Sequence, residues 1–148
     1  MPVTPDVTAP ETILAFDFGL RRIGVAVGQT ITGSASPVGV VANAVSGPDW
    51  QRIGQLIEEW GAARLIVGMP LHVDGSRSES SAMVEAFIAE LQRFSLPVET
   101  IDERYSSAEA QQALVAARKL GTRGRIRKET VDAAAAIVIA ERWLRNER

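Results

Sequence analysis

Residues 13–28, ILAFDFGLRRIGVAVG, constrain the fold of this 148-residue chain more than any other stretch. An apolar run leads to a single carboxylate, Asp17, which lies between two phenylalanines. Gly19 then permits a sharp turn, and after two arginines apolar residues alternate with small ones in the period-2 pattern of a strand. We therefore expect two adjacent strands joined by a tight turn, with Asp17 beside that turn.

Asp17 is the first candidate functional residue. Burying an ionised carboxylate without a partner costs several kcal/mol, so its apolar surroundings predict a cation, hydrogen-bond donors or a metal ion close to it. The alternative interpretation is that Asp17 only caps its own turn. In the second strand, the small residues Gly24, Ala26 and Gly28 predict that another backbone or a substrate approaches closely.

The length and composition predict a single soluble domain. Residues 1–11 contain three prolines and few apolar residues, so we expect a flexible tail before one domain of residues 12–148. The absence of cysteine excludes disulfides, thiolate nucleophiles and cysteine metal sites. No apolar run reaches the ~20 residues that span a bilayer, and the N-terminus lacks the apolar core of a signal peptide. We expect a cytoplasmic protein without membrane contact.

The rest of the chain alternates strand and helix patterns. We expect further strands at residues 32–41, 64–68 and 97–102, and helices at residues 48–60, 76–94, 106–117 and 129–145. Pro37 indicates that the first half of the third strand is irregular. The last helix is apolar nearly all round between residues 133 and 140, which is typical of a helix buried in a core. The predicted fold is α/β, with three antiparallel strands and then two parallel strands in a five-stranded mixed sheet flanked by helices.

Three carboxylates far apart in the sequence lie at ends of these elements. Asp17 ends the first strand, Glu103 follows the last one, and Asp132 opens the last helix. Carboxylates without cysteine favour Mg²⁺ or Mn²⁺ over Zn²⁺, and such ions support phosphodiester hydrolysis. The alternatives are a solvated strand end for Asp102 and Glu103, and an interaction with the helix dipole for Asp132.

The net charge of −2 argues against a protein that coats nucleic acid without discrimination, so a nucleic-acid contact must be a local patch. The segment RKLGTRGRIRK provides one, or else is an ordinary solvated surface. Its basic residues are Arg118, Lys119, Arg123, Arg125, Arg127 and Lys128. The loop that leads to a capping box at Ser76 exposes amide groups suited to phosphate, although every helix needs a cap. His72 in that loop is more often an incidental polar residue than an acid, base or metal ligand.

Four motifs carry a family resemblance: FDFGLRRIGVAV, IVGMPLHVDGS, DERYSSAEA and VDAAAAIVIAE. In this order and spacing they resemble the YqgF/RuvX family over residues 13–143, which is nearly the whole chain. That family is similar to the Holliday-junction resolvase RuvC and has the ribonuclease H-like fold. The resemblance implies that Asp17, Glu103 and Asp132 are the catalytic and metal-binding residues. It also implies that Arg21, Arg22 and Arg104 lie close to the substrate phosphates.

The activity implied by the resemblance is a metal-dependent endonuclease. The family is generally assigned to 5′-end maturation of the small-subunit (16S) ribosomal RNA precursor, and Holliday-junction resolution is the alternative. RuvC and ribonuclease H place a second carboxylate on the middle strand, where this chain has Gly68, Met69 and Pro70. Three carboxylates leave open whether the site binds one metal ion or two. Binding of two ions requires that Asp102 or a substrate phosphate completes the site.

Two other classes of protein remain as alternatives. An Asp-x-Gly turn between strands also opens sugar-kinase and actin-like ATPases, but those need a duplicated domain for which 148 residues leave no room. A non-catalytic RNA-binding module would bind phosphates through the basic segment without a metal ion. The sequence does not choose between RNA and branched DNA, because phosphate contacts do not identify the strand, nor between a monomer and a homodimer.

Overall fold

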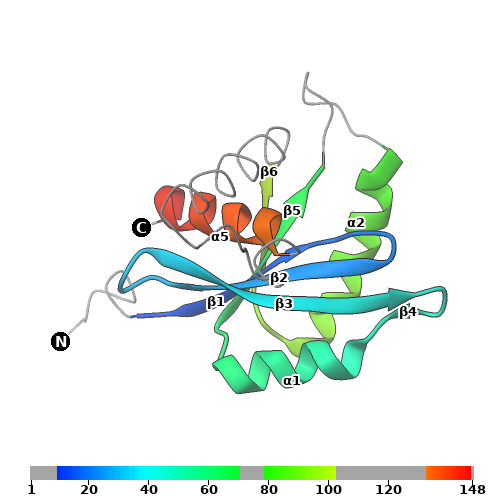
Figure 1. The fold of residues 1–148 in the computed structure, drawn as a ribbon, viewed down its shortest axis with the longest axis horizontal. Helices are drawn as coiled ribbons and strands as arrows, with labels where there is room; N and C mark the ends of the chain where they lie inside the picture. Colours follow the sequence, from blue (N-terminus) through cyan, green and yellow to red (C-terminus); the bar gives the residue numbers. More distant parts are fainter. Residues whose placement is uncertain (1–9, 71–78, 103–132, 148) are drawn as a thin grey trace, which may run out of the picture.

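A mixed sheet with helices on both faces organises the protein (Figure 1). The structure is a computed structural model that describes residues 10–70, 79–102 and 133–147. In this part of the chain the strand order is β4-β3-β2-β1-β5-β6. The strands are β1 (Thr12–Asp17), β2 (Arg22–Gln29), β3 (Ser34–Ala44), β4 (Gly47–Pro48), β5 (Arg64–Met69) and β6 (Val98–Asp102).

The first three strands form the expected antiparallel half of the sheet. β1 pairs with β2, and β2 pairs with β3. The register shifts between Val25 and Ala26, whose partners on β3 are Gly39 and Pro37, so β3 carries one extra residue there. The predicted irregularity at Pro37 is therefore confirmed.

The predicted strand count of five is wrong, because β3 continues to Ala44 and turns back into the two-residue strand β4. Gly47 supplies the positive φ of +118° for this return. The contact with β3 ends at Asp49, whose N–H donates to the Ala42 carbonyl at 3.0 Å. Pro48 was expected near the start of a helix, and that helix, α1 (Trp50–Trp60), begins after Asp49, whose side chain accepts a hydrogen bond from the Arg52 N–H.

The parallel half of the sheet is confirmed. β5 lies between β1 and β6 and is parallel to both, so the carboxyl ends of these three strands lie at one edge of the sheet. The buried residues Leu65, Ile66 and Val67 show that β5 is covered on both faces, as its continuous apolar run predicts. This shared edge is where an open α/β sheet offers a binding site.

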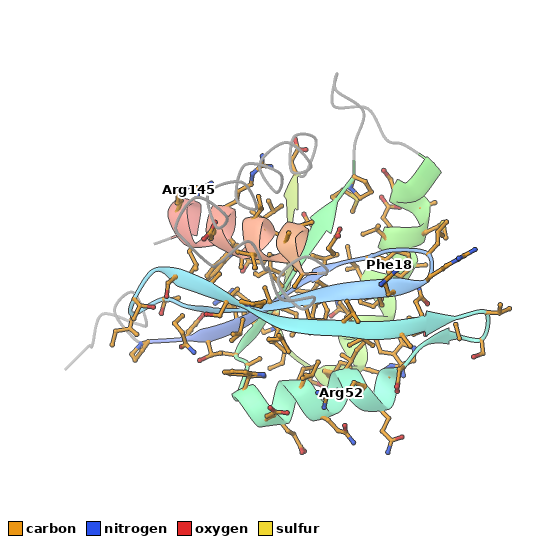
Figure 2. The ribbon with its side chains drawn as sticks, in the orientation of Figure 1. Phe18, Arg52 and Arg145 are labelled. Atoms are coloured by element: carbon orange, nitrogen blue, oxygen red, sulfur yellow. The ribbon has the colours of Figure 1, made fainter. Side chains whose placement is uncertain are left out.

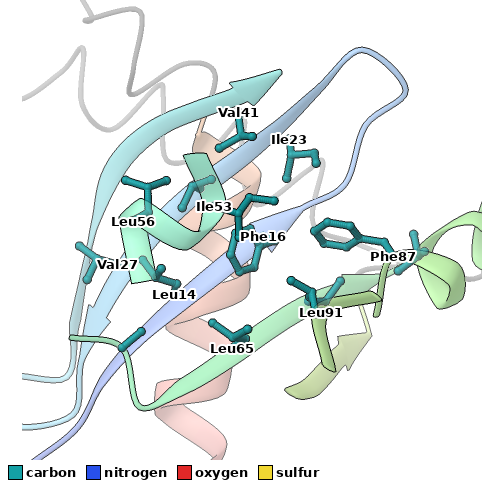
Figure 3. Packing of buried hydrophobic residues seen from close by; sticks show 14 residues of the cluster. Leu14, Phe16, Ile23, Val27, Val41, Ile53, Leu56, Leu65, Phe87 and Leu91 are labelled. Carbon is teal, nitrogen blue, oxygen red and sulfur yellow. The ribbon is translucent and has the colours of Figure 1, made fainter. Parts of the chain in front are cut away.

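One face of the sheet is covered by α1, α2 (Glu79–Leu91) and the 3-10 helix η1 (Gln92–Phe94). Their apolar side chains and the even-numbered residues of β1, Leu14 and Phe16, belong to one buried cluster (Figure 3). α1 ends at Gly61, whose φ of +60° is the left-handed conformation of a helix C-cap. The predicted helix end before Gly61 is therefore confirmed.

The other face is covered by α5 (Ala134–Glu147), which packs on the odd-numbered residues Ile13 and Ala15 of β1. The prediction of a buried last helix is confirmed, whereas its expected beginning at residue 129 lies outside the described residues. A Cβ atom on Gly28 would come within 3.3 Å of Leu144 Cδ1, so the small residues of β2 admit α5 rather than a substrate at this point. None of the described helices is long and apolar enough to cross a membrane.

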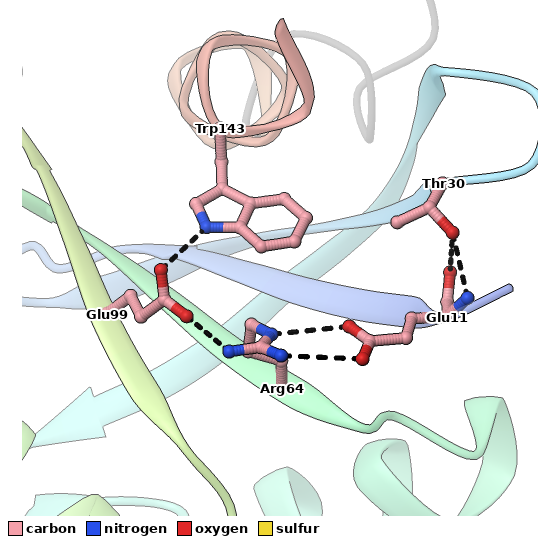
Figure 4. A network of polar contacts seen from close by, with 5 residues as sticks. All are labelled: Glu11, Thr30, Arg64, Glu99 and Trp143. Carbon is pink, nitrogen blue, oxygen red and sulfur yellow. Dashed lines mark hydrogen bonds and ion pairs between the residues drawn. The ribbon is translucent and has the colours of Figure 1, made fainter. Parts of the chain in front are cut away.

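At the amino ends of β1 and β5, Arg64 links the start of β1, through Glu99, to the last helix (Figure 4). Its guanidinium pairs with Glu11 at 3.2 Å and with Glu99, and Glu99 accepts a hydrogen bond of 2.9 Å from Trp143 Nε1. The Glu11 N–H also donates to Thr30 Oγ1 at 2.8 Å. Glu11, the last residue of the predicted tail, is thus anchored to the domain.

Candidate active site

Asp17 is the last residue of β1 and lies at the edge that the carboxyl ends of β5 and β6 share. Ile13 and Ala15 pack toward α5, and strand alternation puts Asp17 on the same face. Its cross-strand partner is Gly24, which has no side chain to cover the carboxylate. The predicted hairpin with a carboxylate beside its turn is therefore confirmed.

The Asp17 carboxylate is half-buried, and burial raises its pKa above the ordinary value because the charged form loses hydration. Within residues 10–70, 79–102 and 133–147, no group donates a hydrogen bond to this carboxylate and no cation pairs with it. The turn after Asp17 is described, so the capping hydrogen bond of the alternative interpretation is absent from it. A ligand of positive charge would stabilise the ionised form of an orphaned carboxylate of this kind.

The turn that follows Asp17 is held from two sides. Phe18, labelled in Figure 2, packs on Phe87 of α2 with ring centroids 5.1 Å apart. On the other side, Asn43 Nδ2 donates to the Gly19 carbonyl at 2.7 Å and the Asn43 N–H donates to the Arg21 carbonyl at 3.0 Å. The exposed side chains of Arg21 and Arg22 therefore extend from a fixed backbone next to Asp17.

Two features of this turn become visible only in the structure. Gly19 does not have a positive φ; glycine is needed because a Cβ would lie 2.5 Å from the Arg22 carbonyl oxygen. Asn43 was not identified from the sequence, although asparagine is depleted in strands and its presence in β3 is a signal of a local role. Its two hydrogen bonds make it the residue that positions the arginines.

Asp102 ends β6 and is paired in register with Met69 of β5. Because β5 carries no carboxylate at this edge, Asp17 and Asp102 are separated by two strand spacings, roughly 10 Å. They also lie on opposite faces, since Ile101 packs with the α5 cluster and alternation turns Asp102 away from it. The Asp102 carbonyl accepts a hydrogen bond from Arg142. Asp17 and Asp102 therefore do not form a shared metal site, because magnesium ligands lie at ~2.1 Å from the ion.

The other expected site residues lie outside the described residues. These are Glu103, Asp132, Arg104 and the basic residues of segment 118–128. His72, for which no site role was predicted, also lies outside the described residues. Glu103 directly follows Asp102 in the sequence, and Asp132 precedes the buried Ala133 and the start of α5. The described residues alone contain no group of three or more histidine, cysteine, aspartate or glutamate side chains that could hold a metal ion.

The direction of α5 matters for Asp132. Leu144 of α5 lies against Gly28, which pairs with Ile13 at the start of β1. The helix begins ten residues earlier, about 15 Å away along its axis, and runs against the direction of β1 (Figure 1). The first turn of α5 therefore points toward the edge that carries Asp17.

The mixed sheet and the helices on its two faces define a class of fold, the ribonuclease H-like fold of RuvC-type resolvases. RuvC of Thermus thermophilus, solved in complex with a Holliday junction substrate, superposes with a TM-score of 0.55 and 14% identity, over 91% of this chain and 94% of that chain. The fowlpox virus resolvase, solved with substrate Holliday junction DNA, gives a TM-score of 0.55 at 11% identity, over 90% of this chain and 97% of that chain. The predicted fold class is confirmed.

The sequence itself matches a narrower group. The family described as "RuvX: Holliday junction resolvase" matches residues 11–146. A relative from Azotobacter vinelandii, named "Putative pre-16S rRNA nuclease", is 44% identical over 139 residues, which are 93% of this chain and 96% of the relative. A relative of the same name from Xanthomonas campestris pv. campestris is 43% identical over 145 residues, 97% of this chain and 94% of the relative. The chain belongs to the RuvX family.

Proposed function

We propose that the chain is a nuclease that hydrolyses phosphodiester bonds in the precursor of 16S ribosomal RNA. The family and the names of the relatives support the reaction and the substrate. The observation that carries the proposal is Asp17: a half-buried carboxylate, without a hydrogen-bond or ion-pair partner among the described residues, at the strand edge where such folds bind ligands. A purely structural carboxylate would have a partner there.

Asp17, Glu103 and Asp132 would hold a divalent cation, Mg²⁺ or Mn²⁺. All three offer carboxylate oxygens, the donors that these hard ions prefer. Glu103 directly follows the end of β6 in the sequence, and Asp132 precedes Ala133 and the start of α5, whose first turn points toward the edge that carries Asp17. When bound, the ion would activate water and stabilise the leaving oxygen.

The arginines of the β1–β2 turn would bind the phosphates of the substrate. Arg21 and Arg22 are exposed, and Asn43 fixes the backbone that carries them. Guanidinium groups suit phosphate because their planar donors match its oxygens. Arg104 and the basic residues of segment 118–128 would bind further phosphates along the nucleic-acid substrate, as the charge pattern of the sequence suggests.

Resolution of Holliday junctions is the second candidate, since the family description names it and the fold is shared with resolvases. A parallel cleavage assay separates the two candidates. The chain is incubated with structured single-stranded precursor RNA and with a four-way DNA junction, each in Mg²⁺, in Mn²⁺ and in EDTA. We expect metal-dependent cleavage of the RNA. Cleavage of the junction alone would establish the second candidate, and binding of RNA without cleavage in either metal would contradict a nuclease.

A thermal melt tests the metal site through stability. Burial raises the pKa of Asp17, so the stability contributed by its protonated form is complete below its ordinary pKa and is lost as pH rises through the folded pKa. At neutral pH the ionised carboxylate therefore lowers the free energy of unfolding. We expect Asp17→Asn to melt about 2–4 °C above the parent in EDTA, the shift that about 1 kcal/mol gives in a chain of this size.

The same variant should gain less stability from the metal ion, because a ligand stabilises the folded state according to its affinity. Asp49→Asn is the matched control: it removes the same charge at the exposed start of α1 and should leave the metal response unchanged. A lower melting temperature of Asp17→Asn in EDTA, together with a parental response to Mg²⁺ and Mn²⁺, would show that Asp17 has only a structural role.

A further inference from the structure

Two exposed apolar side chains lie beside the arginines of the β1–β2 turn. Leu20 is 70% exposed although its backbone is fixed, since the two hydrogen bonds of Asn43 go to the residues before and after it. Two residues beyond Asn43, Val45 lies at the tip of the β3–β4 turn and is fully exposed. The pairing of Asn43 with Arg21 brings the two turns together at the end of the sheet that carries Asp17.

A single exposed leucine is ordinary in a folded protein. Here, however, two apolar side chains on ordered turns accompany two arginines, and no acidic residue occurs between Asp17 and Asp49. This end of the sheet therefore combines local positive charge with apolar surface. A nucleic acid offers the matching pair of groups, since its phosphates are anionic and its bases have apolar faces.

The bases are accessible to apolar side chains only where they are unpaired or unstacked. Within a duplex the base faces are covered by their neighbours, and an apolar side chain must open a base step to reach them. In single strands and at branch points the faces are already accessible. The arrangement of Leu20 and Val45 thus favours a substrate with unpaired nucleotides over a continuous duplex.

We infer that Leu20 and Val45 contact unpaired bases of the substrate next to the phosphates that Arg21 and Arg22 bind. This inference rests on the proposed function and deepens it by naming the substrate class, a nucleic acid with unpaired nucleotides at the point of contact. It gives the exposed tips of two turns a specificity-determining role, separate from the chemistry at Asp17. Charge complementarity and continuity with the Asp17 edge identify the occupant as nucleic acid.

The test compares a double variant, Leu20→Ser with Val45→Ser, with the control Ile31→Ser. Ile31 is 73% exposed, nearly as much as Leu20, but lies in the β2–β3 turn at the opposite end of the sheet. Dissociation constants are measured in EDTA for a short single-stranded RNA, a single-stranded DNA and the corresponding duplexes, each with a fluorescent base analogue. We expect about fivefold weaker binding of the single strands by the double variant, because contact with the bases removes part of the apolar area of each side chain from water.

The fluorescence change of the base analogue on binding should be lost in the double variant and kept in Ile31→Ser, while the affinity for duplexes should change little in either. Equal losses on single strands and duplexes, or an equal effect of Ile31→Ser, would overturn the inference. So would a parental dimer, detected by sedimentation, that the double variant abolishes, since the two turns would then bind a second copy. Retained cleavage in Asp17→Asn would contradict the proposed function instead, whatever the double variant does.

Discussion

Asp17→Asn, Glu103→Gln and Asp132→Asn should each reduce the rate of substrate cleavage at least about 100-fold, because even a residue that only supports a metal ligand is worth 10–100-fold. Binding of the substrate should change little, since in the proposed site the arginines hold the phosphates and the carboxylates hold the metal ion. The measurement is single-turnover cleavage of labelled precursor RNA at saturating protein concentration, with the dissociation constant determined separately in EDTA.

The control for these three variants is Asp102→Asn. Asp102 directly precedes Glu103 and also carries a carboxylate, but it ends β6 on the face of the sheet opposite Asp17. It should keep most of the parental rate. Parental cleavage rates in all three variants would exclude these carboxylates from the reaction. An equally large loss of cleavage rate in Asp102→Asn would mean that the site also includes the face of the sheet that carries Asp102.

Phe87→Ala should lower the free energy of unfolding by about 3–5 kcal/mol, the usual cost of removing a buried aromatic side chain. Phe87 is 2% exposed and its ring contacts three others: Phe16 at 5.9 Å, Phe18 at 5.1 Å and Trp50 at 5.6 Å between centroids. It therefore joins α2 to β1, to the turn after Asp17 and to α1. Urea denaturation of the parent and the variant measures the effect.

Met83→Ala lies on the same helix but at an exposed position, so we expect it to cost less than about 0.5 kcal/mol. Because the ring of Phe87 supports Phe18, Phe87→Ala should also weaken substrate binding, since it loosens the turn that carries the arginines. Phe87→Leu, which refills part of the space, should recover much of both. A stability loss for Phe87→Ala no larger than that of Met83→Ala would show that this aromatic cluster is not part of the stabilising core.

The sequence patterns predicted the elements that periodicity specifies. The alternation around Asp17 gave the hairpin, the continuous apolar run after Arg64 gave the doubly covered strand, and the apolar segment after Ala133 gave the buried helix. Each of these signals is local, because the spacing of apolar residues along a strand or helix shows whether one face of it is buried or both. The position of Asp17 at the shared strand edge followed from the same signals.

Other features had no local signal. β4 has only two residues, too few to show a period, so the sixth strand was missed. The hydrogen bonds of Asn43 depend on the pairing of β3 with β2, which places it beside the turn of another hairpin. The contacts of Arg64 with Glu11 and Glu99 likewise join residues that only the folded sheet brings together.

The position of α5 in the sequence determines when one face of the sheet is covered during synthesis. α5 covers the face of β1 that carries Asp17, and it follows all six described strands in the sequence. During synthesis the six strands leave the ribosome first, and the helix that covers this face follows them. The face of the sheet with the candidate catalytic carboxylate is therefore covered only after the described strands have been made, and a chain whose α5 has not yet left the ribosome cannot form the finished site.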